Sequence, residues 1–228
     1  MRKQGDKVNF VRYADDFIVT GATREILEQK VKPAVIAFLQ QRGLELSEQK
    51  TVITHIQDGF NFLGHTVRKH GDKLLIKPAK RNIQDLQAKI SQMIQSALGL
   101  SQEALIRKLN PSLRGWANYF RNAVAKRTFS TVDHYLFQKL WLWAKRRHPT
   151  KSATWKRQRY FMAAGDGWNF SVRIPLAEGK SRVLKLYGMA QTRIERHIKV
   201  RGAANPFDPA YTDYFDKRRC FAGRVLSG

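Results

Sequence analysis

The sequence predicts an α+β fold in which a part with short strands precedes a helical part. Residues 8–13 and 17–20 are two runs rich in Val, Ile, Phe and Tyr, which is typical of a β-hairpin. From Pro78 onward, apolar residues recur instead at the 3.6-residue period of helices. With 228 residues, 43% of them hydrophobic, the chain can bury the core of one large domain or two smaller ones.

Two hairpins and one helix are expected in the N-terminal part. The first hairpin places Asp15 and Asp16 at its turn. Apolar residues at helical spacing predict a helix within residues 23–42, and Gly43 follows where a C-terminal cap belongs. The second hairpin is expected to pair residues 60–69 with residues 73–77 through a turn at residues 70–72.

The rest of the chain is expected to form a helical bundle and a less regular tail. An apolar stripe over residues 83–97 ends at Gly99, and a short helix follows Ser101. Asn110-Pro111 predicts the start of another helix, because proline suits the first helical position. Ser130, with Asp133 three residues later, predicts a capping-box variant at the next helix. Beyond Gly165 we expect a strand at residues 168–172, a helix at 187–197 and a turn-rich loop at 203–209.

The charge points to a polyanionic partner. The chain has 42 Lys and Arg against 18 Asp and Glu, a net charge of +24. Residues 79–164 hold 17 of the basic residues and only 3 acidic ones. Long apolar runs near the roughly 18 residues of a membrane-spanning helix are absent, so nucleic acid is favoured over a membrane.

Cysteine usage favours a reducing compartment. The single cysteine, Cys220, excludes an intrachain disulfide framework and a zinc ribbon built from cysteine pairs. The first six residues do not resemble a signal or transit peptide. We therefore expect a cytoplasmic protein of the bacterial cytosol rather than of an organelle.

The adjacent carboxylates Asp15 and Asp16 have two interpretations. Such a pair at a strand-turn-strand can hold hard divalent cations, because Mg²⁺ prefers oxygen ligands and nucleotide phosphates can complete its shell. Two aspartates in a turn are also ordinary turn chemistry. The neighbouring residues favour the first interpretation.

Residues 10–19, Phe-Val-Arg-Tyr-Ala-Asp-Asp-Phe-Ile-Val, resemble the palm motif of reverse transcriptases. Residues 44–51, Leu-Glu-Leu-Ser-Glu-Gln-Lys-Thr, and residues 60–64, Phe-Asn-Phe-Leu-Gly, resemble the two motifs that follow it in that family. The resemblance implies an RNA-directed DNA polymerase with a magnesium site. Residues 1–77 would then be a partial palm domain.

The family's residue roles transfer to matching positions. Asp15 matches the carboxylate that coordinates both metal ions and Asp16 its weaker partner. Tyr13 and Ala14 match the floor near the primer end, and Phe62, Leu63 and Gly64 match the loop that steadies the primer. Lys50 stands where a lysine approaches the nucleotide's phosphates, although an exposed lysine at a strand end is the alternative.

Another metal-binding aspartate of this family lies in an earlier palm motif, which the given sequence does not include. The resemblance therefore implies that this chain alone would not carry out nucleotidyl transfer, because a two-metal site would lack a ligand.

The basic segment resembles a more specific family. Residues 109–121, 141–149 and 155–161 are similar to the maturase-specific domain, domain X, of group II intron proteins. Residues 78–164 would then be the thumb and domain X, with intron RNA as the partner. Arginine and lysine neutralise phosphates, and exposed aromatic planes stack on unpaired bases. The candidate RNA-binding residues are Arg114, Arg121, Lys126, Arg127, Lys139, Arg146, Arg147, Lys151, Lys156, Arg157 and Arg159.

The tail, residues 165–228, resembles the DNA-binding region that follows domain X, with target DNA as a further partner. Its candidate DNA-binding residues are Arg193, Arg196, Lys199 and Arg201. A nuclease with zinc-binding cysteines comes next in many relatives, and one cysteine cannot form that site.

The leading function is binding of group II intron RNA to assist splicing, in a family of mobile genetic elements that also uses reverse transcription in retrohoming. Two alternatives remain open. The chain could be half of a split active reverse transcriptase, with a separate N-terminal fragment as its partner, or a non-functional remnant of a mobile intron protein.

Overall fold

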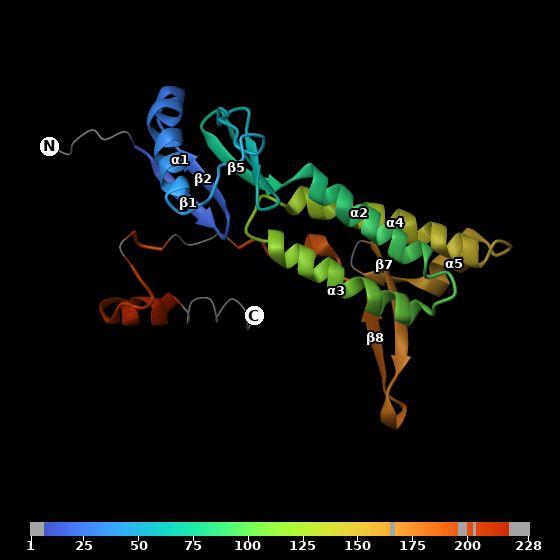
Figure 1. Ribbon diagram of the computed structural model, residues 1–228. Coiled ribbons are helices and arrows are strands. Elements are labelled where there is room, and N and C mark those ends of the chain that lie inside the picture. Colours follow the sequence, from blue (N-terminus) through green and yellow to red (C-terminus); the bar gives the residue numbers. More distant parts are fainter. Residues whose placement is uncertain (1–6, 165–166, 196–199, 203, 219–228) are drawn as a thin grey trace. The chain divides into compact units, whose positions relative to one another are not determined.

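The computed structural model describes residues 7–164, 167–195, 200–202 and 204–218 (Figure 1). It divides into two compact units, Met1–Gln84 and Asp85–Gly228. Small antiparallel sheets and helices make up the described residues, which confirms the predicted α+β class.

The first hairpin lies where the sequence predicts it. Strands β1 (Asn9–Tyr13) and β2 (Asp16–Thr20) pair antiparallel, with Tyr13 opposite Asp16. The two turn residues are Ala14 and Asp15, and Ala14 has a φ of 52°, in the left-handed region that hairpin turns require. The rings of Phe10 and Phe17 stack across the strands, with centroids 5.7 Å apart.

The expected helix consists of a π-helical segment, η1 (Ile26–Val31), continued by α1 (Lys32–Gln40). The Thr23 hydroxyl accepts a hydrogen bond from the Ile26 N–H (3.4 Å) at its start. Gly43 has a φ of 67°, which lets the Leu44 N–H return to the Leu39 carbonyl (3.0 Å). The glycine cap is therefore confirmed.

The second sheet contains one more turn than predicted. Its strands are β3 (Phe60–Phe62), β4 (His65–His70) and β5 (Lys73–Pro78), in the order β3-β4-β5. The prediction of one continuous strand over residues 60–69 was wrong, because Leu63 and Gly64 have φ angles of 46° and 73°. Two successive left-handed residues form a tight hairpin turn that reverses the chain.

The first unit has little interior of its own. Among residues 7–77, all described, no side chain is buried. Several large apolar side chains are exposed instead, including Phe10 (58%), Tyr13 (65%) and Phe38 (55%). A two-stranded hairpin is only marginally stable in water by itself.

The second unit has a well-packed helical core. Its helices are α2 (Lys80–Gln95), α3 (Gln102–Phe120), α4 (Lys126–Arg147) and α5 (Ala153–Tyr160). The first turn of α2 precedes Asp85, where this unit begins. Ser101 and Ser152 cap α3 and α5, each accepting a backbone N–H at 3.2 Å. The core contains Leu86, Ile90, Ile94, Leu105, Leu109, Leu113, Phe120, Phe129, Leu136, Leu140 and Trp143.

Helix α3 runs without a break through Asn110-Pro111, so the prediction of a helix start there was wrong. Proline at this position removes one backbone N–H, but the buried face of α3 continues through Leu109 and Leu113. The Asn110 amide serves a tertiary contact instead of a cap. It donates to the Lys185 carbonyl (3.0 Å) and accepts from the Tyr187 N–H (2.8 Å).

Helix α4 begins at Lys126, so Ser130 is not its cap. The carboxylate of Asp133 accepts instead from the N–H groups of Met189 (2.9 Å) and Ala190 (2.8 Å). These bonds hold the single turn η3 (Met189–Gln191) against α4. Burial raises the pKa of Asp133, and the two N–H groups oppose that rise. Within the described part of residues 187–197, the predicted helix is wrong, because only this one turn forms.

A third sheet follows the helices. Strand β7 (Gly167–Pro175) pairs through its first half with β6 (Phe161–Ala164) and through its second half with β8 (Ser181–Lys185), which confirms the predicted strand. The buried Gln102 side chain joins α3 to this sheet by donating to the carbonyls of Tyr160 (2.7 Å) and Ser171 (3.1 Å). The short turns η2 (Ala177–Gly179) and η4 (Pro209–Tyr211) follow, and residues 212–218 are helical.

Arg147 supports the loop that follows α2. Its guanidinium donates to the carbonyls of Leu98 (3.0 Å) and Leu100, and it lies 5.1 Å from the ring of Trp143. Loop carbonyls lack the partners that regular secondary structure provides, so this side chain stabilises the unit.

We predict that Asn110→Ala lowers the free energy of unfolding by about 1–2 kcal/mol, because it removes two hydrogen bonds and leaves the Tyr187 N–H without this acceptor. Urea denaturation measures the change. Asn118→Ala, at an exposed position of the same helix, is the matched control and should change stability by less than about 0.5 kcal/mol. Equal effects of the two substitutions would contradict the assigned contact.

A second pair of variants separates two neighbouring cations. Arg147→Ala should destabilise the chain by about 1–2 kcal/mol, since it removes bonds to two carbonyls and packing over Trp143. Arg146→Ala, at an exposed position, should stay within about 0.5 kcal/mol. Thermal unfolding of both variants tests this, and a stable Arg147→Ala variant would refute it.

Candidate functional site

The paired carboxylates lie together at the first hairpin turn. Asp15 is in the turn, Asp16 is the first residue of β2, and both are exposed. Their oxygens are the donor type that Mg²⁺ prefers. The described residues contain no group of three or more His, Cys, Asp or Glu side chains that could hold a metal ion. Asp15 and Asp16 therefore fit part of a magnesium site, and further ligands would have to come from elsewhere.

The other predicted polymerase residues occupy separate turns of the first unit. Lys50 is exposed in a turn, and its backbone N–H donates to the Ser47 carbonyl (3.2 Å). Phe62 ends β3, and Leu63 and Gly64 form the tight turn before β4. The Gly64 carbonyl accepts from the Ala79 N–H (2.9 Å), which holds this turn against the end of β5. Tyr13 and Ala14 adjoin the carboxylates directly.

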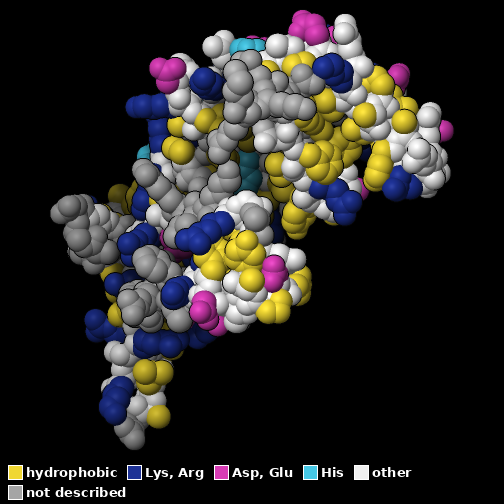
Figure 2. Space-filling model, turned by 90° about the vertical axis from the view of Figure 1, so that its left-hand side faces the viewer, with side chains coloured by type: hydrophobic (Ala, Val, Ile, Leu, Met, Phe, Trp, Pro, Cys, Tyr) yellow, Lys and Arg dark blue, Asp and Glu magenta, His cyan; other side chains and the backbone are white. Residues whose placement is uncertain are grey.

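Many basic side chains of the second unit are exposed, as the charge distribution predicts. Figure 2 shows Lys and Arg side chains on one side of the molecule. Lys145 is exposed in the last turn of α4, and the sequence interpretation did not include it among the RNA-binding residues. It is the first residue of the run Lys145-Arg146-Arg147, and this run of basic residues could have indicated it as a candidate. The predicted RNA-binding residues that are exposed are Arg114, Lys126, Arg127, Arg146, Lys151, Arg157 and Arg159.

Aromatic rings support several of these cations. The Arg157 guanidinium lies 4.9 Å from the centroid of Trp168, which is itself 46% exposed. Lys151 lies 5.6 Å from Trp155, and Arg114 lies 5.2 Å from Tyr187. Cation–π contacts at exposed sites contribute about 0.5–1 kcal/mol each, enough to bias a long side chain toward one orientation. Arg157, Lys151 and Arg114 are therefore each held beside an aromatic ring at this surface.

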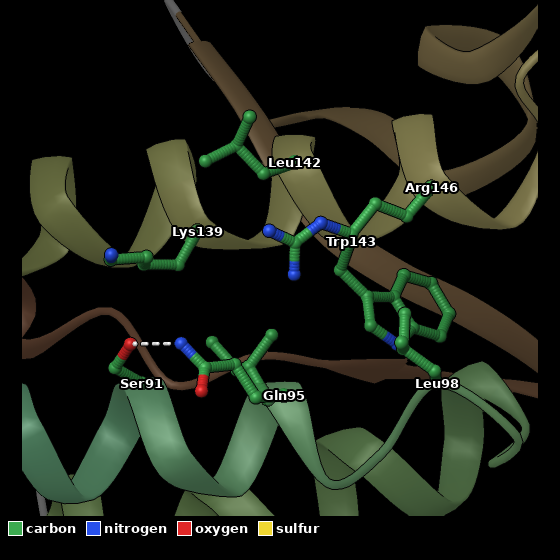
Figure 3. A pocket seen from close by; sticks show the side chains of 8 residues that line it. Ser91, Gln95, Leu98, Lys139, Leu142, Trp143 and Arg146 are labelled. Atoms are coloured by element: carbon green, nitrogen blue, oxygen red, sulfur yellow. Dashed lines mark hydrogen bonds between the residues drawn. The ribbon is translucent and has the colours of Figure 1, made fainter.

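A shallow groove lies between α2 and α4 (Figure 3). The guanidinium of Arg146 points into it, above Gln95, whose amide donates to the Ser91 hydroxyl (3.2 Å). Lys139 and Leu142 border it from α4. Its volume of about 40 Å³ holds a few waters or the oxygens of one phosphate, but not a nucleobase.

Four predicted RNA-binding cations have partners inside the protein. Lys156 is buried and donates to the Lys151 carbonyl, and Arg147 supports the loop after α2. Arg121 forms an ion pair with Glu195 (3.1 Å), and the exposed Lys126 donates to the Ala190 carbonyl (2.8 Å). Sequence alone cannot distinguish these from free cations, because each partner is remote in sequence or is a backbone carbonyl.

His148 ends α4 and adds no charge to this surface. Its Nε2 lies 2.6 Å from the Tyr160 hydroxyl. Loss of hydration lowers its pKa, and the nearby cations Arg147, Arg159, Lys151 and Lys156 lower it further. The ring is therefore neutral at pH 7 and acts as a hydrogen-bonding partner.

Two of the four predicted DNA-binding residues can be placed. Arg193 and Arg201 are exposed, and Arg201 lies 5.0 Å from the ring of Tyr214. The Tyr214 hydroxyl accepts from the Arg201 N–H (3.1 Å), which lowers the tyrosine pKa together with Arg218. Arg196 and Lys199 lie outside the described residues.

Among the described residues, every helix falls short of the length and apolarity needed to cross a bilayer. The chain was also compared with known proteins. A family model for reverse transcriptase (RNA-dependent DNA polymerase) matches residues 1–67. A family model for the group II intron maturase-specific domain matches residues 83–161.

Curated relatives match part of the chain. The group II intron-encoded protein LtrA of Lactococcus lactis subsp. cremoris is 40% identical over 67 residues, which are 28% of this chain and 11% of that protein. LtrA of strain MG1363 of the same subspecies matches to the same extent. The match thus spans about a ninth of the relatives' length. The chain joins the C-terminal part of a reverse transcriptase domain to a maturase-specific domain, and it belongs to the group II intron reverse transcriptase/maturase family.

Proposed function

We propose that the chain binds group II intron RNA through the exposed basic surface of its second unit and thereby assists splicing. One observation carries this proposal: Arg146, Lys151 and Arg157 are exposed within the segment that matches the maturase-specific domain, and two of them lie against aromatic rings. Intron RNA provides the phosphates and unpaired bases that such a surface can bind.

The chemistry of this surface suits folded RNA better than a small ligand. The groove between α2 and α4 has room for a phosphate but not for a base, so the proposed recognition is spread over several separate contacts. Each phosphate neutralised by Lys or Arg releases counterions. An exposed ring such as Trp168, with Arg157 beside it, offers a plane on which an unpaired base can stack. Binding of this kind can hold RNA helices in the arrangement that splicing requires.

A second function, RNA-directed DNA synthesis for retrohoming, is favoured by the hairpin that carries Asp15 and Asp16. In this proposal the carboxylates hold part of a Mg²⁺ site, and another segment supplies the remaining ligands. The exposed apolar side chains of the first unit, such as Phe10 and Tyr13, would be covered by that segment. A separate N-terminal reverse transcriptase fragment is one candidate for it.

Affinity for intron RNA should fall steeply with salt. If several phosphates are neutralised, a plot of log affinity against log salt has a slope of about −0.7 to −0.9 per contact. Fluorescence anisotropy of the full chain with a group II intron RNA, from 50 to 200 mM KCl, measures it. A flat salt dependence would exclude binding through phosphates.

Removing exposed cations should weaken binding at specific positions. The triple variant Arg146→Ala, Lys151→Ala and Arg157→Ala should lower affinity by one to two orders of magnitude and reduce the salt slope by about one unit per lost contact. The matched control removes the same charge from the first unit, through Lys69→Ala, Lys73→Ala and Lys77→Ala, and should have a smaller effect.

The two proposed functions should be separable. Replacing Asp15 and Asp16 with Ala should leave intron RNA affinity unchanged or slightly higher, because it removes two negative charges from an exposed turn. The same anisotropy assay tests this. If the Asp pair is required for RNA binding while the cationic triple is dispensable, RNA recognition does not lie on the second unit.

A further inference from the structure

Two aromatic side chains lie next to each other at the surface of α4. Phe137 and Trp141 are one helical turn apart, and their ring centroids are separated by 6.4 Å. The two ring planes are inclined by only 13°. Phe137 is 42% exposed and Trp141 is half-buried. Phe137 and Trp141 therefore present flat apolar surface to the solvent, and we call them the aromatic pair.

The third sheet holds the aromatic pair in place. Phe161 is 2% exposed, and the centroid of its ring lies 5.3 Å from that of Phe137 and 5.9 Å from that of Trp141. Phe170 opposes Phe161 across the strands and shares its sheet face. Trp168, two residues before Phe170, lies on the same face and is 46% exposed. A buried ring thus supports the pair, and the sheet face beneath it carries a further exposed ring.

The aromatic pair lies on a different side of α4 from the groove between α2 and α4. Successive residues of a helix are rotated by about 100°, which places Arg146 about 180° from Phe137. Figure 3 shows the Arg146 guanidinium in that groove, on the side of α2. The aromatic pair is therefore a surface separate from the phosphate-sized groove.

The charges around the aromatic pair suit a polyanion. Lys145, one turn after Trp141, is exposed. Helix α4 has six basic residues and one acidic residue, Asp133, whose carboxylate already accepts two N–H groups of η3. Residues 153–175, which form α5, β6 and β7, include one acidic residue, Asp166, and it lies outside the described residues. A ligand that combines flat rings with negative charge is therefore complementary to this side of α4.

We propose that the aromatic pair stacks on unpaired bases of a single-stranded RNA segment, with Lys145 beside the phosphates of that segment. Bases within a duplex are paired and stacked on one another, whereas those of loops and bulges can be splayed out onto aromatic side chains. Every base has a flat face, so such stacking tolerates many sequences. The inference rests on the proposed binding of intron RNA, and it assigns a single-stranded part of that RNA to the aromatic pair.

Stacking and phosphate contacts differ in their response to salt. A phosphate neutralised by Lys or Arg releases counterions, so loss of a cation reduces the slope of log affinity against log salt by about 0.7 for a single strand. A stacked ring carries no charge. Loss of the rings should therefore weaken binding at every salt concentration and leave the slope unchanged.

The test compares the full chain with the variant Phe137→Leu, Trp141→Leu, which keeps apolar cover over Phe161 and removes both flat rings. Fluorescence anisotropy from 100 to 300 mM KCl measures binding of a 20-nucleotide oligoadenylate strand and of a 20-base-pair RNA duplex. We expect the variant to bind oligoadenylate about tenfold more weakly, with the same salt slope. Its affinity for the duplex should stay within about threefold of the wild-type value, which also shows that the basic surface is still folded.

Two control variants make the result specific. Phe137→Tyr, Trp141→Phe keeps two aromatic rings and should bind oligoadenylate within about threefold of the wild-type affinity. Leu142→Ala removes a side chain of α4 that is 46% exposed but not aromatic, and it should change that affinity by less than about twofold. A loss of affinity in Leu142→Ala as large as that in Phe137→Leu, Trp141→Leu would overturn the inference.

Three other outcomes would also overturn it. The first is an equal loss of affinity for the strand and the duplex, and the second is a reduced salt slope. The third is unchanged oligoadenylate affinity with an altered oligomeric state in sedimentation, which would assign the aromatic pair to a contact between copies of the chain. Failure of the proposed function is distinguishable, because there the triple variant Arg146→Ala, Lys151→Ala and Arg157→Ala would bind intron RNA as tightly as the wild-type chain.

Discussion

The burial of Trp143 is the interaction on which the second unit depends. The ring is 2% exposed, its Nε1–H donates to the Ala97 carbonyl (2.9 Å), and it packs edge-on against Tyr160 (5.3 Å) and Phe170 (5.8 Å). One side chain thus joins the segment after α2 to α4, α5 and β7. A buried tryptophan typically contributes about 3–5 kcal/mol relative to alanine. That contribution matters in a segment whose surface charges repel one another.

This core allows the surface to be strongly basic and still ordered. Residues 79–164 hold 17 basic residues and 3 acidic ones, so ion pairs can satisfy few of the cations. Cations such as Arg147 and Lys156 donate to backbone carbonyls, and others such as Arg157 lie over rings. The protein thus uses some of its positive charge internally and presents the remainder for phosphate. The first unit differs, because several of its large apolar side chains are exposed.

Periodicity and turn chemistry predicted the elements that depend on local sequence. The β1–β2 hairpin, the Gly43 cap and α2 lie where the patterns place them. The errors arose where tertiary contacts use a residue that usually marks a boundary. Asn110 binds the end of β8 instead of capping a helix, and Asp133 holds a remote turn instead of starting α4. For the site, sequence motifs could locate Asp15 and Asp16. They could not show that Lys151 is exposed and Lys156 buried, because that difference depends on the packing of α5.

Chemical footprinting of lysines tests most directly the claim that the second unit binds the RNA. The full chain is acetylated with and without group II intron RNA, and the rate at each lysine is measured by mass spectrometry. The account predicts that the RNA slows modification of the exposed Lys145 and Lys151 and leaves Lys69 and Lys73 unchanged, while the buried Lys156 reacts slowly in both cases. Protection confined to lysines of the first unit, with Lys145 and Lys151 unprotected, would contradict it.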